Sequence, residues 1–591
     1  MLHRKGKLKM YGLMRNRLTA FGLAAAAGAA VMISTALAEP VLPAEKGAIT
    51  IAPADLALTD GNIYTPAGWA EAIAVHDGVI VAVGNEAAIK PYLNEKTKII
   101  DLKGHTVLPG LHDMHVHPAS AGLAHEDCQL PQSATPSQIF LIVAGCVKRH
   151  KPGEWITGRA YEAAAFGKTP PNRYMLDKVA PANPVLLTDI SGHSSWANSL
   201  ALKLAGITKD TPDPHNGIIE RDANGMPTGL LRESAAGLVS KLLPPPTREQ
   251  YASALDWALH QLLDQGITSL DDAFVNEDIA RAYDDLADSS KLVQRVRGCL
   301  DYNEEGLIER RGLYARSNFS PSCIKIFLDG VPTDSHTAAM LEGYEPLPGG
   351  ENVKSREYGM LKIPPKTLDA LLVRFDSMGM TVKMHAAGDA AVHEGIEAIA
   401  AAREAHGFSG LLHDTAHNSF VHMSDIKEAR AIGAAMEFSP YIWYRSPIID
   451  DIQKAVSPQL MDRWIPIKDA LDAGVLAVPG SDWPVVPVAN PWLAIETMVT
   501  REKPGGLGKP LGPAERISLK QAIDMYTINS ARQQYNADKL GSIELGKLAD
   551  VIVIDRDIFA VPITTVHDTK VLMTIINGKV VYDAAHSGLA E

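Results

Sequence analysis

Two histidines separated by one residue form the first group in the sequence that could bind a metal ion. His115-Val116-His117 ends the apolar segment that begins at Val107. Side chains two positions apart on a strand point to the same face, so both imidazoles can reach one ion. Asp113 is close enough to orient a ring by accepting its N–H. Histidines at this spacing are also frequent by chance, so the pair needs further support.

Three more candidates stand at the ends of other short apolar segments, namely His385, His417 and Asp482. Each could by itself be a helix cap or an ordinary hydrogen-bonded residue. Together with the first pair they make four histidines and one aspartate at strand ends, where barrel enzymes build their active sites. This set favours a metal-dependent catalytic site. His422 is a rival to His417, although it lies beyond the expected strand end.

Lys325 lies in the apolar segment 324–328 and has two interpretations. An ammonium group with a pKa of about 10.4 repels a metal cation. Lys325 could therefore be a ligand only if it is neutral or if its nitrogen is converted to a carbamate. The alternative is an ion pair with Asp329 or Asp482.

The middle of the chain alternates predicted strands with helical segments. Residues 324–328, 381–385 and 474–478 read as strands, and a helix is expected over 390–405. This alternation predicts βαβ units and a parallel sheet. The length of the region favours an α/β fold with an enclosed (β/α)₈ TIM-type barrel. An open doubly wound sheet is the alternative, but no G-x-G-x-x-G motif opens a helix after a strand.

Both ends of the mature chain are rich in short β-like segments. They cover residues 48–108 and 550–582, and Asn577-Gly578 between two apolar segments predicts a hairpin. We therefore expect one small sheet domain assembled from both termini. Residues 125–246 interrupt the alternation with proline and glycine clusters, and we interpret them as an insertion over the barrel mouth.

The first 38 residues have the pattern of a secretory signal peptide. A basic start without acidic residues precedes an apolar run over 18–33, and Ala36-Leu37-Ala38 offers a cleavage site before Glu39. We expect an exported protein, periplasmic or secreted. The alternative is an uncleaved membrane anchor. No other run is long enough to span a membrane.

The composition of the 591 residues, with 46% hydrophobic and 21% charged side chains, is that of a globular protein. A net charge of −13 argues against a nucleic-acid partner. The four cysteines are too few and too scattered to predict a disulfide framework or a zinc knuckle.

Several of these segments resemble the amidohydrolase superfamily, most closely its YtcJ-like, or amidohydrolase-3, branch. The main matches are residues 107–118, 324–331, 382–390 and 474–485, with shorter ones at 155–158, 192–199, 227–230 and 541–550. The resemblance implies a metal-bearing (β/α)₈ barrel and a β-sandwich domain made from both termini. It suggests residues 39–108 as the first part of the sandwich, 109–510 as the barrel, and 511–591 as a last helix and the second part.

The resemblance also implies roles for individual residues. His115 and His117 would be ligands from the first strand, and His385 and His417 ligands from strands five and six. Lys325 resembles a lysine that is carboxylated and bridges two metals in some members. Asp482 would bind metal and shuttle protons. By the resemblance, His193 and Glu233 would face the substrate. Independently of it, Trp443, Tyr444 and Trp483 lie near predicted strand ends and could pack on an apolar substrate, or could equally be core or rim residues.

One position departs from the pattern of this family. Where members usually have Glu-His-Ala-Gln, this chain has Thr415-Ala416-His417-Asn418. The glutamate before the histidine is absent, which bears on what orients His417 and on the choice of substrate.

The function expected from these observations is hydrolysis of an amide or related C–N bond in a small molecule by metal-activated water. Asp482 would shuttle the proton, and His193 and Lys325 would assist catalysis. Imidazole and carboxylate ligands suit zinc best, with one or two ions. The alternatives are a degenerate barrel acting as a periplasmic binding protein, and a metal-dependent lyase. A homodimer is compatible with this interpretation.

Overall fold

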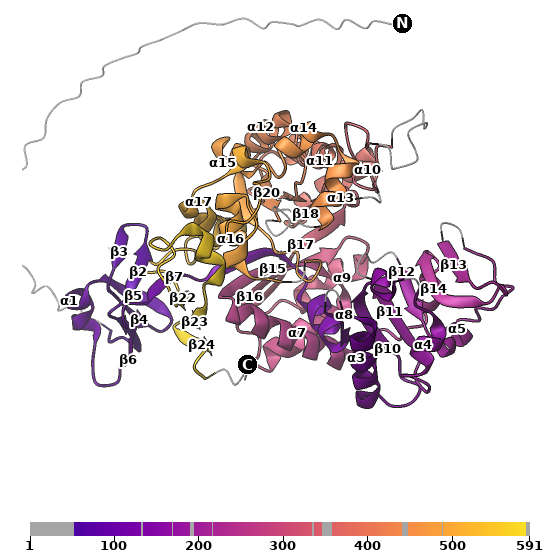
Figure 1. The fold of residues 1–591 in the computed structure, drawn as a ribbon. Coiled ribbons are helices and arrows are strands. Elements are labelled where there is room, and N and C mark those ends of the chain that lie inside the picture. The colour runs from indigo at the N-terminus through magenta and orange to yellow at the C-terminus, as the bar shows by residue number, and fades with distance from the viewer. Residues whose placement is uncertain are drawn as a thin grey trace, which may run out of the picture. The chain divides into compact units, whose positions relative to one another are not determined.

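The core of the molecule is an eight-stranded parallel sheet in the order β21-β20-β19-β18-β17-β16-β15-β8 (Figure 1). The computed structural model describes residues 52–586 except 132–133, 168, 190–193, 215–216, 334–335, 346–356, 440–446 and 487, and it leaves out the side chains of 160, 164, 233 and 447. The strands are β8 (Leu111–Val116), β15 (Ile267–Val275), β16 (Arg295–Asp301), β17 (Phe319–Phe327), β18 (Thr381–Ala386), β19 (Asp414–His417), β20 (Ala435–Phe438) and β21 (Leu476–Pro479).

Backbone hydrogen bonds connect the two ends of this sheet. The N–H of Asp482, just after β21, donates to the carbonyl of His115 on β8 at 2.7 Å. The N–H of His117 donates to the carbonyl of Trp483 at 2.9 Å. The first and last strands therefore meet, and the sheet is a nearly closed barrel. The TIM-type prediction is confirmed, and the open doubly wound alternative is wrong.

The helices that cover the strands follow local sequence rules. Thr247 and Gln250 form a capping box at the start of α7 (Arg248–Asp264). On α11 (Asp389–His406), Val392, Ile396 and Ile399 recur at helical spacing and are buried. The other helices of the barrel are α2 (Pro118–Glu126), α8 (Glu277–Asp288), α9 (Glu305–Arg310), α10 (Pro365–Ser377), α12 (Met423–Ile432), α13 (Pro447–Ala455), α14 (Pro458–Asp462), α15 (Ile467–Asp472) and α16 (Pro491–Thr500).

The two ends of the chain build a β-sandwich, as expected. Its sheets have the orders β5-β4-β1-β6 and β24-β23-β22-β7-β2-β3. The strands are β1 (Leu56–Thr59), β2 (Asn62–Thr65), β3 (Gly68–Ala70), β4 (Ala72–His76), β5 (Val79–Gly84), β6 (Lys98–Asp101), β7 (Thr106–Pro109), β22 (Val551–Ile554), β23 (Val571–Ile576) and β24 (Lys579–Asp583). Figure 1 shows β7 beside β22, which it pairs antiparallel with Leu108 opposite Ile552. Side chains from both sheets share one core.

The predicted hairpin is present at the C-terminal end of this sandwich. Asn577 and Gly578 both have positive φ, of 51° and 69°, between the antiparallel strands β23 and β24. Two central residues with positive φ form the turn that matches the twist of a two-stranded ribbon, and Asn-Gly is the pair that adopts it most easily.

The insertion between β8 and β15 folds into a sheet of its own. The order is β13-β14-β12-β11-β10-β9. Its strands are β9 (Cys128–Gln129), β10 (Ile156–Tyr161), β11 (Val185–Asp189), β12 (Ser194–Ala197), β13 (Gly217–Arg221) and β14 (Pro227–Glu233), and its helices include α3 (Pro136–Arg149), α4 (Arg173–Asp177) and α5 (Ser199–Leu204). Separate hydrophobic clusters lie on this sheet. Its position over the barrel mouth stays a prediction.

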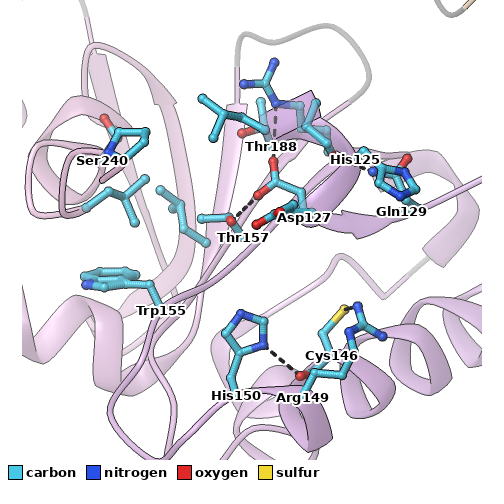
Figure 2. Close-up of a pocket in the computed structure, with 18 of the residues that line it drawn as sticks. His125, Asp127, Gln129, Cys146, Arg149, His150, Trp155, Thr157, Thr188 and Ser240 are labelled. Atoms are coloured by element: carbon cyan, nitrogen blue, oxygen red, sulfur yellow. Dashed lines mark hydrogen bonds and ion pairs between the residues drawn. The ribbon is translucent and has the colours of Figure 1, made fainter. Parts of the chain in front are cut away.

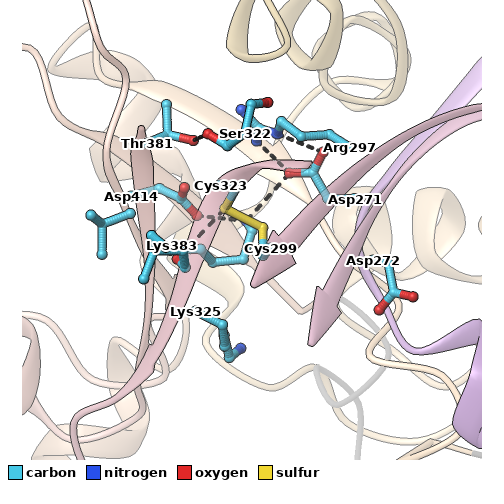
Figure 3. The surroundings of a disulfide bond; sticks show 12 residues. Asp271, Asp272, Arg297, Cys299, Ser322, Cys323, Lys325, Thr381, Lys383 and Asp414 are labelled. Atoms are coloured by element: carbon cyan, nitrogen blue, oxygen red, sulfur yellow. Dashed lines mark hydrogen bonds and ion pairs between the residues drawn. A yellow bond between two sulfur atoms is a disulfide. The ribbon is translucent and has the colours of Figure 1, made fainter. Parts of the chain in front are cut away.

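All four cysteines are paired, contrary to the expectation from their number and scatter. Cys128 on β9 is bonded to Cys146 on α3, with 6.0 Å between the Cα atoms. Cys299 on β16 is bonded to Cys323 on β17, with 4.1 Å between the Cα atoms (Figure 3). The expectation was wrong because the fold brings together partners that lie 18 and 24 positions apart.

The N-terminal segment 1–38 lies outside the described residues, so the signal-peptide prediction is not tested by the structure. Within 52–586, apart from the gaps given above, no helix combines the length and the apolar character needed to cross a membrane.

We predict that the protein contains no free thiol. Alkylation after denaturation without reductant should label none of the four cysteines, and mass spectrometry should find four labels after reduction. The reduced sample is the control for accessibility. Labelling of Cys299 or Cys323 in the unreduced sample would contradict the pairing between β16 and β17.

Candidate metal centre

The carboxyl ends of the barrel strands bring the four predicted histidines into one row. The ring centroids are 5.4 Å apart for His117 and His115, 4.7 Å for His115 and His417, and 4.4 Å for His417 and His385. The rings come from the first, fifth and sixth strands of the barrel, as the order of the sheet shows. Residues separated by up to 302 positions in the sequence thus form one continuous group of imidazoles.

Asp482 completes a set of donors next to the first two rings. Its Oδ1 lies 3.3 Å from Nε2 of His117 and 3.7 Å from Nε2 of His115. One ligand atom from each of these three residues lies within 4.8 Å of the others. Two imidazole nitrogens and a carboxylate oxygen are the donors that zinc and similar divalent ions prefer. The residues present therefore fit a divalent metal ion.

A buried glutamate that the sequence analysis did not identify lies beside these ligands. Glu437 on β20 is 0% exposed, and its Oε2 lies 2.7 Å from Nδ1 of His115. With His115 and His417 it forms a second group whose ligand atoms lie within 4.8 Å. Burial raises the pKa of Glu437, while the ammonium of Lys383 acts in the opposite direction. The one feature of the sequence that could have pointed to Glu437 is a charged residue inside a short apolar strand.

Asp113 does not have the role predicted for it. Its Oδ1 accepts the backbone N–H groups of His115 at 3.2 Å and Ser481 at 2.9 Å, and so joins β8 to the segment after β21. The partner of the His115 ring is Glu437 instead. Sequence proximity suggested Asp113, but its carboxylate accepts backbone N–H groups at the strand junction, and the ring is reached by Glu437 from another strand.

Lys325 is enclosed within the site. Its side chain is 1% exposed, and Nζ lies 3.0 Å from Nε2 of His115. Burial lowers the pKa of Lys325, although the carboxylate of Asp482 opposes this effect. Asp329, one of the alternative partners, accepts the backbone N–H groups of Ala339, Ala387 and Gly388 instead.

The surroundings favour the metal-binding protonation states of the other groups. Burial lowers the pKa of His385 to about 4, and lowers the pKa values of His115 and His417 well below the usual range. These three imidazoles are therefore neutral near pH 7, which is the form that binds a metal. Burial opposes ionisation of Asp482, but the hydrogen bond with His117 is among the interactions that outweigh it and lower its pKa.

Two candidate ligands have a backbone conformation that is uncommon for residues other than glycine. The φ angle is 74° for His417 and 56° for Asp482, and Asn418, which follows His417, has a φ of 47°. Such positions cost about 1–3 kcal/mol each and are concentrated at functional sites. Asn418 holds the turn after β19, because its Nδ2 donates to the carbonyls of Thr415 at 2.9 Å and Glu437 at 2.7 Å.

The structure also decides between His417 and its rival. His422 is exposed and caps α12, and its Nδ1 contacts the hydroxyl of Ser424 at 2.7 Å. It is a helix cap and not part of the row of imidazoles.

The predicted substrate-facing residues are placed only in part. His193, Trp443 and Tyr444 lie outside the described residues, and Glu233 ends β14 with its side chain not described. Trp483 is 9% exposed and packs in the barrel core with its ring 5.9 Å from Trp257. A contact between these residues and a substrate therefore stays a prediction.

A cavity of about 1460 Å³ lies elsewhere, between the insertion sheet and the end of α2 (Figure 2). His125, Asp127, Arg149, His150 and Trp155 are among the residues that line it, and Thr157 donates a hydrogen bond to Asp127. None of the candidate metal ligands contributes to its lining. We therefore place the candidate site at the strand ends, on the basis of their chemistry.

A parallel barrel with imidazoles and a carboxylate at its strand ends is the arrangement in which TIM-barrel enzymes build their active sites. An amidohydrolase family profile matches residues 98–582, and the chain belongs to this family of hydrolases. The resemblance noted in the sequence is thereby confirmed.

Individual proteins agree with this assignment. The chain is 28% identical over 562 residues to the N-substituted formamide deformylase of Arthrobacter pascens, covering 90% of this chain and 99% of the relative. It is 29% identical over 544 residues to YtcJ of Bacillus subtilis (strain 168), covering 88% and 98%. An uncharacterized metal-dependent hydrolase from Pyrococcus horikoshii OT3 shares the fold, with a TM-score of 0.71, 24% identity, and coverage of 86% of this chain and 99% of that one.

Proposed function

We propose that this hydrolase uses a divalent metal to cleave a C–N bond, in an amide or a related group, of a small molecule. The observation that carries the proposal is the convergence of His115, His117 and Asp482 at the end of the first and last barrel strands. His385 and His417 extend the same row of donors. The intact set argues against a degenerate barrel that only binds its ligand.

The metal would be held by His115, His117 and Asp482, with His385 and His417 available for a second ion. Zinc suits these donors best. When bound, such an ion lowers the pKa of a water molecule towards about 7 and polarises the carbonyl of the substrate. Lys325, which is buried and contacts His115, would supply a further metal ligand if its nitrogen were carboxylated.

The side chains of the protein would move the proton. Asp482 carries a lowered pKa and lies within 3.3 Å of His117, so its carboxylate is ionised and held in a fixed position. It would accept a proton as water attacks the carbonyl carbon, and return that proton to the leaving nitrogen. His193, outside the described residues, would add a hydrogen bond to the oxygen of the carbonyl as negative charge develops there.

The proposed substrate is an amide, and N-substituted formamides are a natural first group to assay. A relative matched over 99% of its length bears the name N-substituted formamide deformylase. Fold and family do not select the substrate by themselves, since the insertion and the loops after each strand shape the pocket.

We predict that Asp482→Asn lowers kcat by about 10²–10⁴-fold, because the amide cannot accept the proton. Metal content should be retained, since the amide oxygen can still coordinate. The measurement is steady-state kinetics with elemental analysis of the same sample. Asp425→Asn is a matched control, because Asp425 is also buried and also contacts a histidine, His393 at 3.0 Å. Full activity of Asp482→Asn would exclude the proposed proton shuttle.

Metal content per chain should be two equivalents after growth with zinc and carbonate, if Lys325 bridges two ions. Lys325→Ala should then lower the content to one. One equivalent of metal in the wild type would remain compatible with metal-dependent hydrolysis, but it would exclude a bridging role for Lys325. No metal in the wild type would refute the proposal and favour the binding protein. Lys362→Ala is a control for loss of a nearby lysine. Like Nζ of Lys325, Nζ of Lys362 lies over the ring of Phe327, at 5.6 Å from its centroid.

We propose further that the protein is exported. The basic and apolar pattern of residues 1–38 supports this, and so do the two disulfides, which persist in oxidising compartments. N-terminal sequencing of protein recovered from the periplasm or the medium should begin at Glu39. An intact start at Met1 in the exported fraction would contradict cleavage.

A further inference from the structure

We propose that Glu437 is the common positioning residue for His115 and His417, holding each imidazole with its proton on Nδ1 and its Nε2 free for the metal. This inference rests on the proposed metal-dependent function and deepens it. Glu437 would not itself bind the metal or touch the substrate. It would determine which nitrogen of each ring is presented.

The contact with His115 is direct. Glu437 Oε2 lies 2.7 Å from Nδ1 of His115, and both side chains are at most 1% exposed. When Glu437 is ionised, its carboxylate oxygens only accept, so the ring carries its proton on Nδ1. Nε2 then has a free lone pair, and it is the nitrogen that faces Lys325 at 3.0 Å and Asp482 at 3.7 Å. A carboxylate that binds the far nitrogen of a ligand histidine fixes its tautomer and orientation.

The contact with His417 runs through a serine and through the backbone. Ser439 Oγ donates to Glu437 Oε1 at 3.3 Å, which leaves its oxygen to accept from Nδ1 of His417 at 2.8 Å. The backbone N–H of His417 donates to Glu437 Oε2 at 3.3 Å. One carboxylate therefore reaches ligands from two separate strands. This N–H belongs to a residue with a positive φ of 74°.

The last barrel strand closes tightly around this carboxylate. A Cβ added to Gly480 would lie 2.6 Å from Glu437 Oε1 and 2.3 Å from Cβ of His115. Contacts this short require atoms to move, so only glycine fits here. The enclosure prevents Glu437 from turning away and keeps water from replacing it as a partner.

The position beside Glu437 on the neighbouring strand carries a small side chain. Ala416 on β19 is the register partner of Glu437 on β20. Paired residues on parallel strands point to the same face, so the two positions open onto the same space. A carboxylate introduced at position 416 would therefore enter the space around Glu437, where alanine presents only a methyl group.

The decisive experiment measures affinity for Zn²⁺, by competition with a chromophoric chelator, and the visible spectrum of the Co²⁺-loaded protein. Glu437→Gln should weaken Zn²⁺ binding by about 10–100-fold while the stoichiometry at saturation stays as in the wild type. The Co²⁺ bands should shift, because the orientation of the ligands changes. Glu496→Gln is the matched control, because Glu496 is also 0% exposed and accepts from a histidine, Nδ1 of His567 at 2.6 Å.

The double variant Ala416→Glu with Glu437→Ala tests the positional argument. It moves the carboxylate to the register partner, and it should recover most of the affinity that Glu437→Ala alone loses. Recovery would not follow from a merely structural role. If Glu437→Gln fails to fold, the double variant still decides the question.

Three results would overturn the inference, each in a different way. Unchanged affinity and spectrum in Glu437→Gln would show that the rings are held by other contacts. Loss of a whole metal equivalent at saturation would make Glu437 a ligand. No recovery in a folded double variant would refute the shared space. Failure of the wild type to bind any metal would instead refute the proposed function.

Discussion

The structure depends on the meeting of the first and last barrel strands. The hydrogen bonds from Asp482 to His115 and from His117 to Trp483 close the barrel with the backbone of the residues that carry the site. Asp113 reinforces the junction by accepting N–H groups from both sides. The contacts that close the ring therefore also bring the candidate metal ligands together. A barrel left open at this junction would keep its histidines but lose the carboxylate beside them.

A layer of buried, paired charges lies beneath the candidate site. Inside the barrel, Lys383 pairs with Asp414 at 2.6 Å and Arg297 with Asp271 at 2.9 Å, close to the Cys299–Cys323 disulfide (Figure 3). These ions are paired, as buried charges must be. They lie nearer the start of the strands than the imidazoles do. The site thus stands on a fully enclosed layer, which keeps water away from one side and lowers the histidine pKa values through burial.

The segment around His417 is held by its own side chains and faces the neighbouring strand β20. Thr415 and Asn418 bind each other and the backbone, and hold the turn in its left-handed conformation. Ala416 has a small side chain, and its register partner on the next strand is Glu437. In a parallel sheet, neighbouring strands present side chains to a common interior, so a group can change strands and still reach the same place.

Much of this architecture was readable from local patterns alone. The alternation of strands and helices, the Asn577-Gly578 hairpin and the orientation of His115 and His117 follow from backbone periodicity and turn chemistry, which involve only nearby residues. The partnership of Glu437 with His115, separated by 322 positions, was decided by the tertiary structure, as were both disulfides. Which strands become neighbours, and in which register, depends on packing of the whole chain. The sequence therefore determined which residues could bind a metal, and the fold decided which group orients them.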